Sequence, residues 1–168
     1  MFYLNKFYSE YKWEDIKEKG IFKYILVDVT LYKIIVQGMI LCILNGIFTG
    51  AISNVNQFYF RDIFIKLLLF SLLGVTIGYL EWNFLKQLGK KDSKLDFNMF
   101  LRFIVIYGVL NWGVLLGIAV SNYFLKDFIM KLIIWGMVGM VYGIILWWIH
   151  YDKFKKLSNG TRDGTRDS

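Results

Sequence analysis

Residues 62–82 read DIFIKLLLFSLLGVTIGYLEW, and residues 127–147 read DFIMKLIIWGMVGMVYGIILW. The two stretches share six identical residues at a constant offset of 65, which is several times what chance would give. The shared positions are Asp62/Asp127, Lys66/Lys131, Leu67/Leu132, Gly74/Gly139, Gly78/Gly143 and Trp82/Trp147. We interpret the two stretches as copies of one helix in a duplicated unit.

Each copy lies in an apolar run of membrane-spanning length. A helix needs about 20 apolar residues to cross a hydrocarbon core of about 30 Å. Four segments meet this requirement approximately, namely residues 34–52, 63–82, 103–120 and 128–149. The chain contains no proline, so each segment is free to form one continuous helix. The 57% hydrophobic content also exceeds the proportion usual in soluble domains.

The basic residues predict the orientation of these helices. Sixteen of the 20 Lys and Arg residues lie before the first segment, between the second and third, or after the fourth. Only four flank the two remaining connections. Because basic residues favour the cytoplasmic side, we expect both termini in the cytoplasm and the chain in the plasma (inner) membrane. The net charge of +7 then favours anionic lipids at the cytoplasmic face rather than nucleic acid.

The predicted fold is all-α: a polytopic membrane protein whose four transmembrane helices form two duplicated hairpins of the same orientation. Residues 1–30 are expected to form a cytoplasmic or interfacial amphipathic segment. Its first 20 residues would form a helix that Gly20 could end, and a loosely ordered polar leader is the alternative. The first hairpin then covers residues 31–88, a cytoplasmic loop 89–98, the second hairpin 99–156 and a disordered cytoplasmic tail 157–168. We expect Ser93 or Asp96 to cap the third helix.

Glycine spacing predicts how the helices pack. Each of the four carries a Gly-x-x-x-Gly pair, and in lipid such small residues let two backbones approach closely. The pairs are Gly46/Gly50, Gly74/Gly78, Gly113/Gly117 and Gly139/Gly143.

A few polar side chains fall inside the predicted spans and form a candidate intramembrane site. Asn45 and Asn111 lie deep in the first and third helices, where they either link the two hairpins or line a substrate path. Glu81 is the one carboxylate embedded in a predicted span, and His150 ends the fourth helix at a similar depth. These two residues either form a titratable pair or meet water and lipid headgroups separately.

Lys66 and Lys131 lie four residues after Asp62 and Asp127, at the outer ends of their helices. This spacing predicts anchoring ion pairs with the aspartates. The alternative is an outer contact with the headgroup of an anionic lipid.

The sequence shows no catalytic, cofactor or metal signature. With one cysteine and one histidine, it offers no metal cluster, and no nucleotide-binding loop or nucleophile motif is present. We therefore expect a small non-enzymatic integral membrane protein without cofactors. It would act through helix–helix contacts as an accessory, regulatory or immunity-type component of an inner-membrane assembly, with a membrane-protein partner or as a homo-oligomer. The alternative is a small oligomeric transporter or channel for cations, hydrophobic compounds or lipid headgroups.

Overall fold

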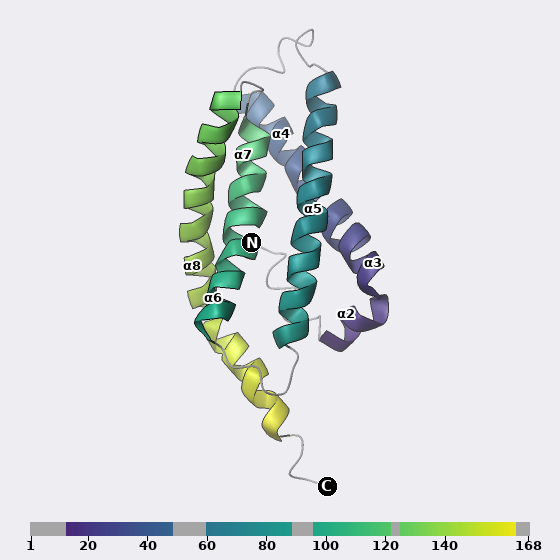
Figure 1. Ribbon diagram of the computed structural model, residues 1–168, viewed down its shortest axis with the longest axis vertical. Helices are drawn as coiled ribbons and strands as arrows, with labels where there is room; N and C mark the ends of the chain where they lie inside the picture. The colour runs from purple at the N-terminus through teal and green to yellow at the C-terminus, as the bar shows by residue number, and fades with distance from the viewer. Residues whose placement is uncertain (1–12, 49–59, 89–95, 122–124, 164–168) are drawn as a thin grey trace.

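The computed structural model describes residues 13–48, 60–88, 96–121 and 125–163, and the elements in these ranges are helices (Figure 1). Within them, four helical runs are long and apolar enough to cross a membrane. We call them spans 1 to 4: Ile21–Phe48, Ile63–Leu88, Phe97–Val120 and Asp127–Tyr151. The prediction of an all-helical, multi-pass membrane protein is thus confirmed.

Spans 1 and 3 are each built from three consecutive helical elements. Span 1 consists of α3 (Ile21–Lys23), the π-helical η1 (Tyr24–Ile35) and α4 (Val36–Phe48). Span 3 consists of α6 (Phe97–Phe103), the π-helical η4 (Ile104–Val114) and α7 (Leu115–Val120). Spans 2 and 4 lie within the single helices α5 (Phe60–Leu88) and α8 (Leu125–Asp163). A short helix, α2 (Trp13–Lys19), precedes span 1.

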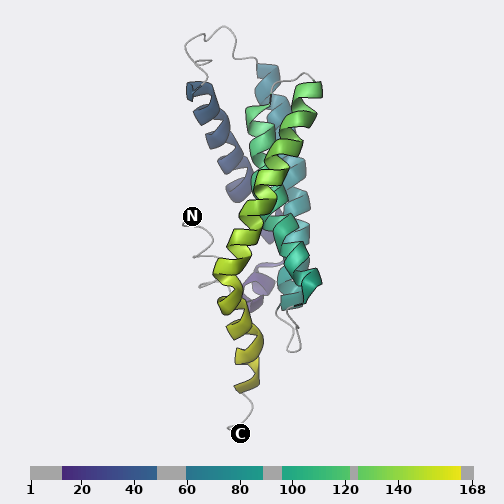
Figure 2. The same cartoon turned by 90° about the vertical axis from the view of Figure 1, so that its left-hand side faces the viewer.

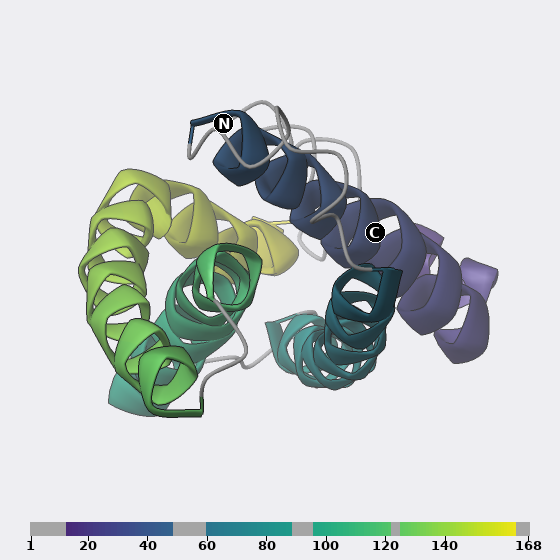
Figure 3. The same ribbon diagram turned by 90° about the horizontal axis from the view of Figure 1, so that it is seen from above.

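The spans alternate in direction. Spans 1 and 3 end where α5 and α8 begin, at the upper end of the bundle in Figures 1 and 2, and α2 lies at the opposite end. Span 1 crosses the bundle obliquely, because η1 packs on α5 whereas α4 packs on α7 (Figure 3). Span 3 is the central helix: 61% of its most apolar window is buried, against 22–28% for the other three.

The start of the first span differs from the prediction. The sequence placed it at residue 34 because Asp28 and Lys33 precede that point, but the helical run starts at Ile21. Both charges are paired: Lys19 Nζ lies 3.1 Å from Asp28 Oδ2, and Lys33 pairs with Glu81 on span 2. The candidate span therefore includes residues 21–30, which the prediction assigned to the amphipathic segment.

Two predicted helix ends are confirmed. Gly20 follows α2 with φ of 80°, a left-handed conformation that glycine adopts without steric cost. Asp96 caps α6, since its Oδ1 accepts a hydrogen bond of 2.9 Å from the backbone N–H of Met99. At the other end of the chain, α8 continues through Ser158 to Asp163, so the helix extends into the segment predicted as a disordered tail. Residues 1–12 and Ser93 lie outside the described residues.

Glycines bring span 2 close to span 1. A Cβ added at Gly74 would lie 2.8 Å from the Thr30 Cα, and one at Gly78 would lie 3.2 Å from the Ile25 Cα. Real Cβ atoms essentially never show the separation found at Gly74, and the one at Gly78 is tighter than nine in ten real Cβ contacts. The faces of α5 that carry these glycines therefore lie directly on the backbone of η1.

Span 4 makes the corresponding approach to span 3. A Cβ at Gly139 would lie 2.8 Å from the Gly113 Cα, and one at Gly143 would lie 3.0 Å from the Gly108 Cα. Gly117, on span 3, meets Leu132 of α8 in the same way. Gly46 is buried, whereas Gly50 lies outside the described residues.

These contacts predict opposite effects for two alanine substitutions on α8. Gly139→Ala forces a methyl group against the backbone of span 3 and should lower the free energy of unfolding by about 1–3 kcal/mol. Gly136→Ala is the matched control, because a Cβ there has nothing within 4 Å. It should leave stability unchanged or raise it by about 0.5–1 kcal/mol through helix propensity. Thermal unfolding in detergent would measure both, and equal effects of the two variants would contradict the packing.

Candidate intramembrane charge site

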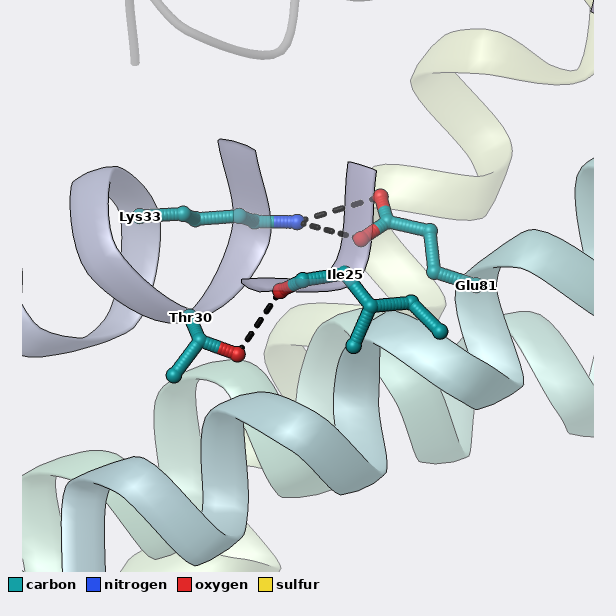
Figure 4. Close-up of polar contacts among 4 residues, drawn as sticks. All are labelled: Ile25, Thr30, Lys33 and Glu81. Atoms are coloured by element: carbon teal, nitrogen blue, oxygen red, sulfur yellow. Dashed lines mark hydrogen bonds and ion pairs between the residues drawn. The ribbon is translucent and has the colours of Figure 1, made fainter. Parts of the chain in front are cut away.

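An ion pair between Lys33 and Glu81 lies inside the bundle (Figure 4). Lys33 Nζ is 3.1 Å from Glu81 Oε1 and 3.0 Å from Oε2, so one ammonium binds both carboxylate oxygens. The Glu81 side chain is 0% exposed and that of Lys33 is 13% exposed. A charge at this depth is costly in lipid unless it is paired, and intramembrane ionisable groups are candidates for function.

The antiparallel course of spans 1 and 2 lets the two side chains meet. In a helix each Cα–Cβ bond tilts toward the N-terminus. Lys33 on η1 and Glu81 on α5 therefore lean toward each other, since the two helices run in opposite directions. The close approach of Gly74 and Gly78 to η1 brings the helices near enough for the pair to form.

The π-helical backbone of η1 carries its own local hydrogen bonds next to the pair. Thr30 Oγ1 donates to the carbonyl of Ile25 at 2.7 Å, five residues back (Figure 4). The backbone N–H of Val36 also bonds five residues back, to the carbonyl of Leu31. π-Helical geometry is rare in proteins and is frequent at functional sites.

Span 3 contributes an aromatic ring to the site. Lys33 Nζ lies 5.1 Å from the centroid of the Tyr107 ring, a distance that permits a cation–π interaction. The ammonium thus links three spans: it is carried by span 1, paired with span 2 and placed over a ring of span 3.

Further aromatic side chains surround this ring. Tyr107 lies 4.7 Å from Phe103 and 6.1 Å from Phe84, measured between ring centroids. Phe103 also contacts Trp147 of span 4 at 5.3 Å. These rings form part of the buried core, so they exclude water from one side of the ion pair and strengthen its electrostatic attraction.

The position 65 residues after Glu81 holds Leu146, which is 3% exposed. Glu81 and Leu146 are both buried, one with a charged side chain and the other with an apolar one.

The remaining predicted polar residues lie on spans 1, 3 and 4. Asn111, on η4, is 5% exposed, and its Oδ1 has no hydrogen-bond partner among the described residues. Asn45 is half-buried on α4. His150 is buried, and its Nδ1 lies 2.9 Å from the carbonyl oxygen of Leu146 on its own helix. The carboxylate of Glu81 is paired with Lys33, and its approach to His150 stays a prediction.

Lys66 and Lys131 converge on the C-terminal end of span 3. Lys66 Nζ donates to the carbonyl of Ala119 at 3.1 Å, and Lys131 Nζ donates to that of Val120 at 2.9 Å. The last carbonyls of a helix lack intrahelical partners and carry the negative end of the helix dipole, so lysines stabilise them. Lys131 also pairs with Asp127 at 3.0 Å, at the predicted four-residue spacing. The side chain of Asp62 lies outside the described residues, and binding of an anionic lipid here stays a prediction.

Lys33 and Tyr107 were not predicted as members of the site. A usable signal was present for Lys33, which is followed by an uncharged stretch that lasts until Arg61 and has an oppositely charged residue in the next span. No comparable signal marked Tyr107 in this aromatic-rich chain. Among the described residues, no group of three or more His, Cys, Asp or Glu side chains could hold a metal ion.

Comparison with known protein families, with curated proteins and with solved structures gave no match. The functional interpretation therefore rests on the geometry of the site and on the surfaces of the spans.

The buried pair predicts strong coupling between two leucine substitutions. Lys33→Leu leaves the Glu81 charge unpaired and should lower the free energy of unfolding by about 3–5 kcal/mol. The double variant Lys33→Leu/Glu81→Leu should recover most of this loss, because replacing both members of a buried pair is often neutral or stabilising. Lys19→Leu is the control: it removes a partly exposed pair with Asp28, which should cost about 1 kcal/mol or less. Additive effects of the Lys33 and Glu81 substitutions would show that the pair does not form.

Proposed function

We propose that this protein is a non-enzymatic component of an inner-membrane assembly that acts through helix–helix contacts with another membrane protein. The observation that carries the proposal is that three lysines of the spans bind groups of the chain itself. Lys33 binds Glu81, and Lys66 and Lys131 bind the end of span 3. These groups hold the bundle together, so the lateral surface offered to a partner is apolar.

The exposed apolar surface is most extensive on span 4. Large side chains project outward along most of its length, while only a few of its residues are buried. The exposed set includes Met130, Ile133, Ile134, Met137, Val138, Met140, Val141, Ile144, Ile145 and Trp148. Gly136 lies among them, and the space beyond its Cα is open to 4 Å. A partner helix could approach the backbone of span 4 at this glycine, as small residues allow in membranes.

The proposal also covers the origin of the two hairpins and the location and orientation of the protein in the cell. We infer that spans 1–2 and spans 3–4 are duplicated hairpins, supported by the six shared residues and by the matching glycine contacts on η1 and η4. We place the end of the bundle that carries α2 in the cytoplasm and the protein in the plasma membrane, supported by the distribution of Lys and Arg. α2 would then lie at the cytoplasmic interface.

A second candidate function is cation-coupled transport by an oligomer. One observation favours it, namely the fully buried carboxylate of Glu81, because paired acids inside the bilayer mark many ion pathways. The carboxylate would have to exchange Lys33 for a transported cation.

The two functions differ in what a gently purified preparation should contain and do. If the contact function is right, mild-detergent purification should recover a stoichiometric membrane-protein partner. Gly136→Ile should reduce the recovered partner several-fold without lowering thermal stability, because it blocks only the open side of the glycine. Leu72→Phe, on the exposed face of α5, is the control and should retain the partner.

The same preparation, reconstituted in liposomes, should show no cation flux under the contact function. Recovery of the chain without any partner, together with a flux that Glu81→Gln abolishes, would overturn the proposal in favour of transport. Equal loss of partner in Gly136→Ile and Leu72→Phe would instead show that span 4 is not the contact surface.

A further inference from the structure

The Glu81 carboxylate and the Tyr107 ring both lie against the Lys33 ammonium, and Asn111 follows Tyr107 by four residues on η4. We propose that the carboxylate, the ring and the Asn111 amide form an intramembrane binding site for a primary ammonium ion, and that Lys33 is the tethered occupant of this site in the present structure. A small aliphatic amine would bind when the lysine side chain leaves. This site goes beyond the contact function and does not depend on it.

The groups around Lys33 Nζ are arranged as in a binding site for an ammonium ligand. The ammonium binds both oxygens of one carboxylate at 3.0 and 3.1 Å. The face of an aromatic ring lies 5.1 Å away. A carboxylate combined with a π-face is how proteins bind organic ammonium ions, and both interactions strengthen when water is excluded.

Stability alone does not account for the pair. A buried ion pair is costly to desolvate, and apolar replacements of similar volume are often at least as stable. The chain contains such a replacement, since Leu146 is buried at the position 65 residues after Glu81. Glu81 therefore has a role that leucine at the related position does not fulfil.

Asn111 supplies an acceptor that the bundle leaves unused. It lies on η4 four residues after Tyr107, one helical turn closer to the end of span 3. Its side chain is 5% exposed, and no described donor reaches its Oδ1. Buried acceptors without a partner are costly, so this oxygen is a candidate second acceptor for an untethered ammonium ion, which has three N–H donors.

The lysine side chain marks the route into the site. Glu81 is fully buried, whereas 13% of the Lys33 side chain is exposed. Removing the lysine beyond its Cβ would therefore open a channel of matching length from the surface to the carboxylate. Propylammonium is the fragment that Lys33→Ala removes, so it is the probe of choice.

The test is chemical rescue of Lys33→Ala in detergent, followed by tryptophan fluorescence during thermal unfolding. The variant should unfold several degrees below the wild-type protein, and propylammonium should raise its unfolding temperature in a saturable way. 1-Propanol, and sodium at equal ionic strength, should not. Lys33→Ala/Glu81→Gln should show no rise with propylammonium, and Lys33→Ala/Asn111→Leu should need several-fold more of it.

Two outcomes would overturn the site. One is an equal rise with propylammonium and with sodium, and the other is an equal rise in Lys33→Ala and Lys33→Ala/Glu81→Gln. Lys33→Gln with methylammonium is the second variant, because the shorter neutral side chain leaves room for a smaller ion. Failure to recover folded Lys33→Ala and folded Lys33→Gln, even with the amine present throughout purification, would also contradict the proposal. The rescue experiment measures amine binding. A negative result therefore has no bearing on the partner and flux measurements, which test the proposed function.

Discussion

A charge in the hydrocarbon core must be neutralised by the protein itself, because no water is present to solvate it. This constraint explains the arrangement of the bundle. Lys33 and Glu81 satisfy each other across spans 1 and 2, and this fixes how the two helices are aligned along their length. Lys66 and Lys131 use the carbonyls at the end of span 3. Span 3 is therefore contacted at two levels, near its middle by the Lys33 ammonium over the Tyr107 ring and at its C-terminus by two lysines. Its central, most buried position follows from these contacts.

The main outline of the fold could be predicted from the sequence because length, hydropathy and capping are local properties. The four spans, the cap at Asp96, the turn at Gly20 and the Asp127–Lys131 pair all depend on residues close together in the chain. The start of span 1 could not be placed in this way. Lys33 looked like a boundary because its partner is 48 residues away, and only the folded bundle shows that the charge is neutralised. The π-helical geometry of η1 and η4 likewise has no local signal in the sequence.

The candidate site was predicted in part for the same reason. Glu81 and Asn111 stood out as polar residues within apolar runs, and the ring of His150 contacts a carbonyl oxygen of its own helix. The lysines at 66 and 131 were assigned to aspartates and lipid, and their contact with the end of span 3 depends on tertiary packing. Under the proposed duplication, Leu146 is the buried apolar counterpart of Glu81.

The central claim is that Lys33 and Glu81 are in direct contact within the bilayer, and solid-state NMR tests it most directly. The full chain would be reconstituted in lipid bilayers with ¹⁵N-lysine and ¹³C-glutamate labels, and the Glu81→Gln variant would serve to assign the signal. We predict strong dipolar dephasing of the Glu81 side-chain carboxyl carbon by the Lys33 side-chain nitrogen, as expected for atoms in a paired ammonium and carboxylate. A Glu81 carboxyl signal that shows no dephasing by lysine nitrogen would contradict the account.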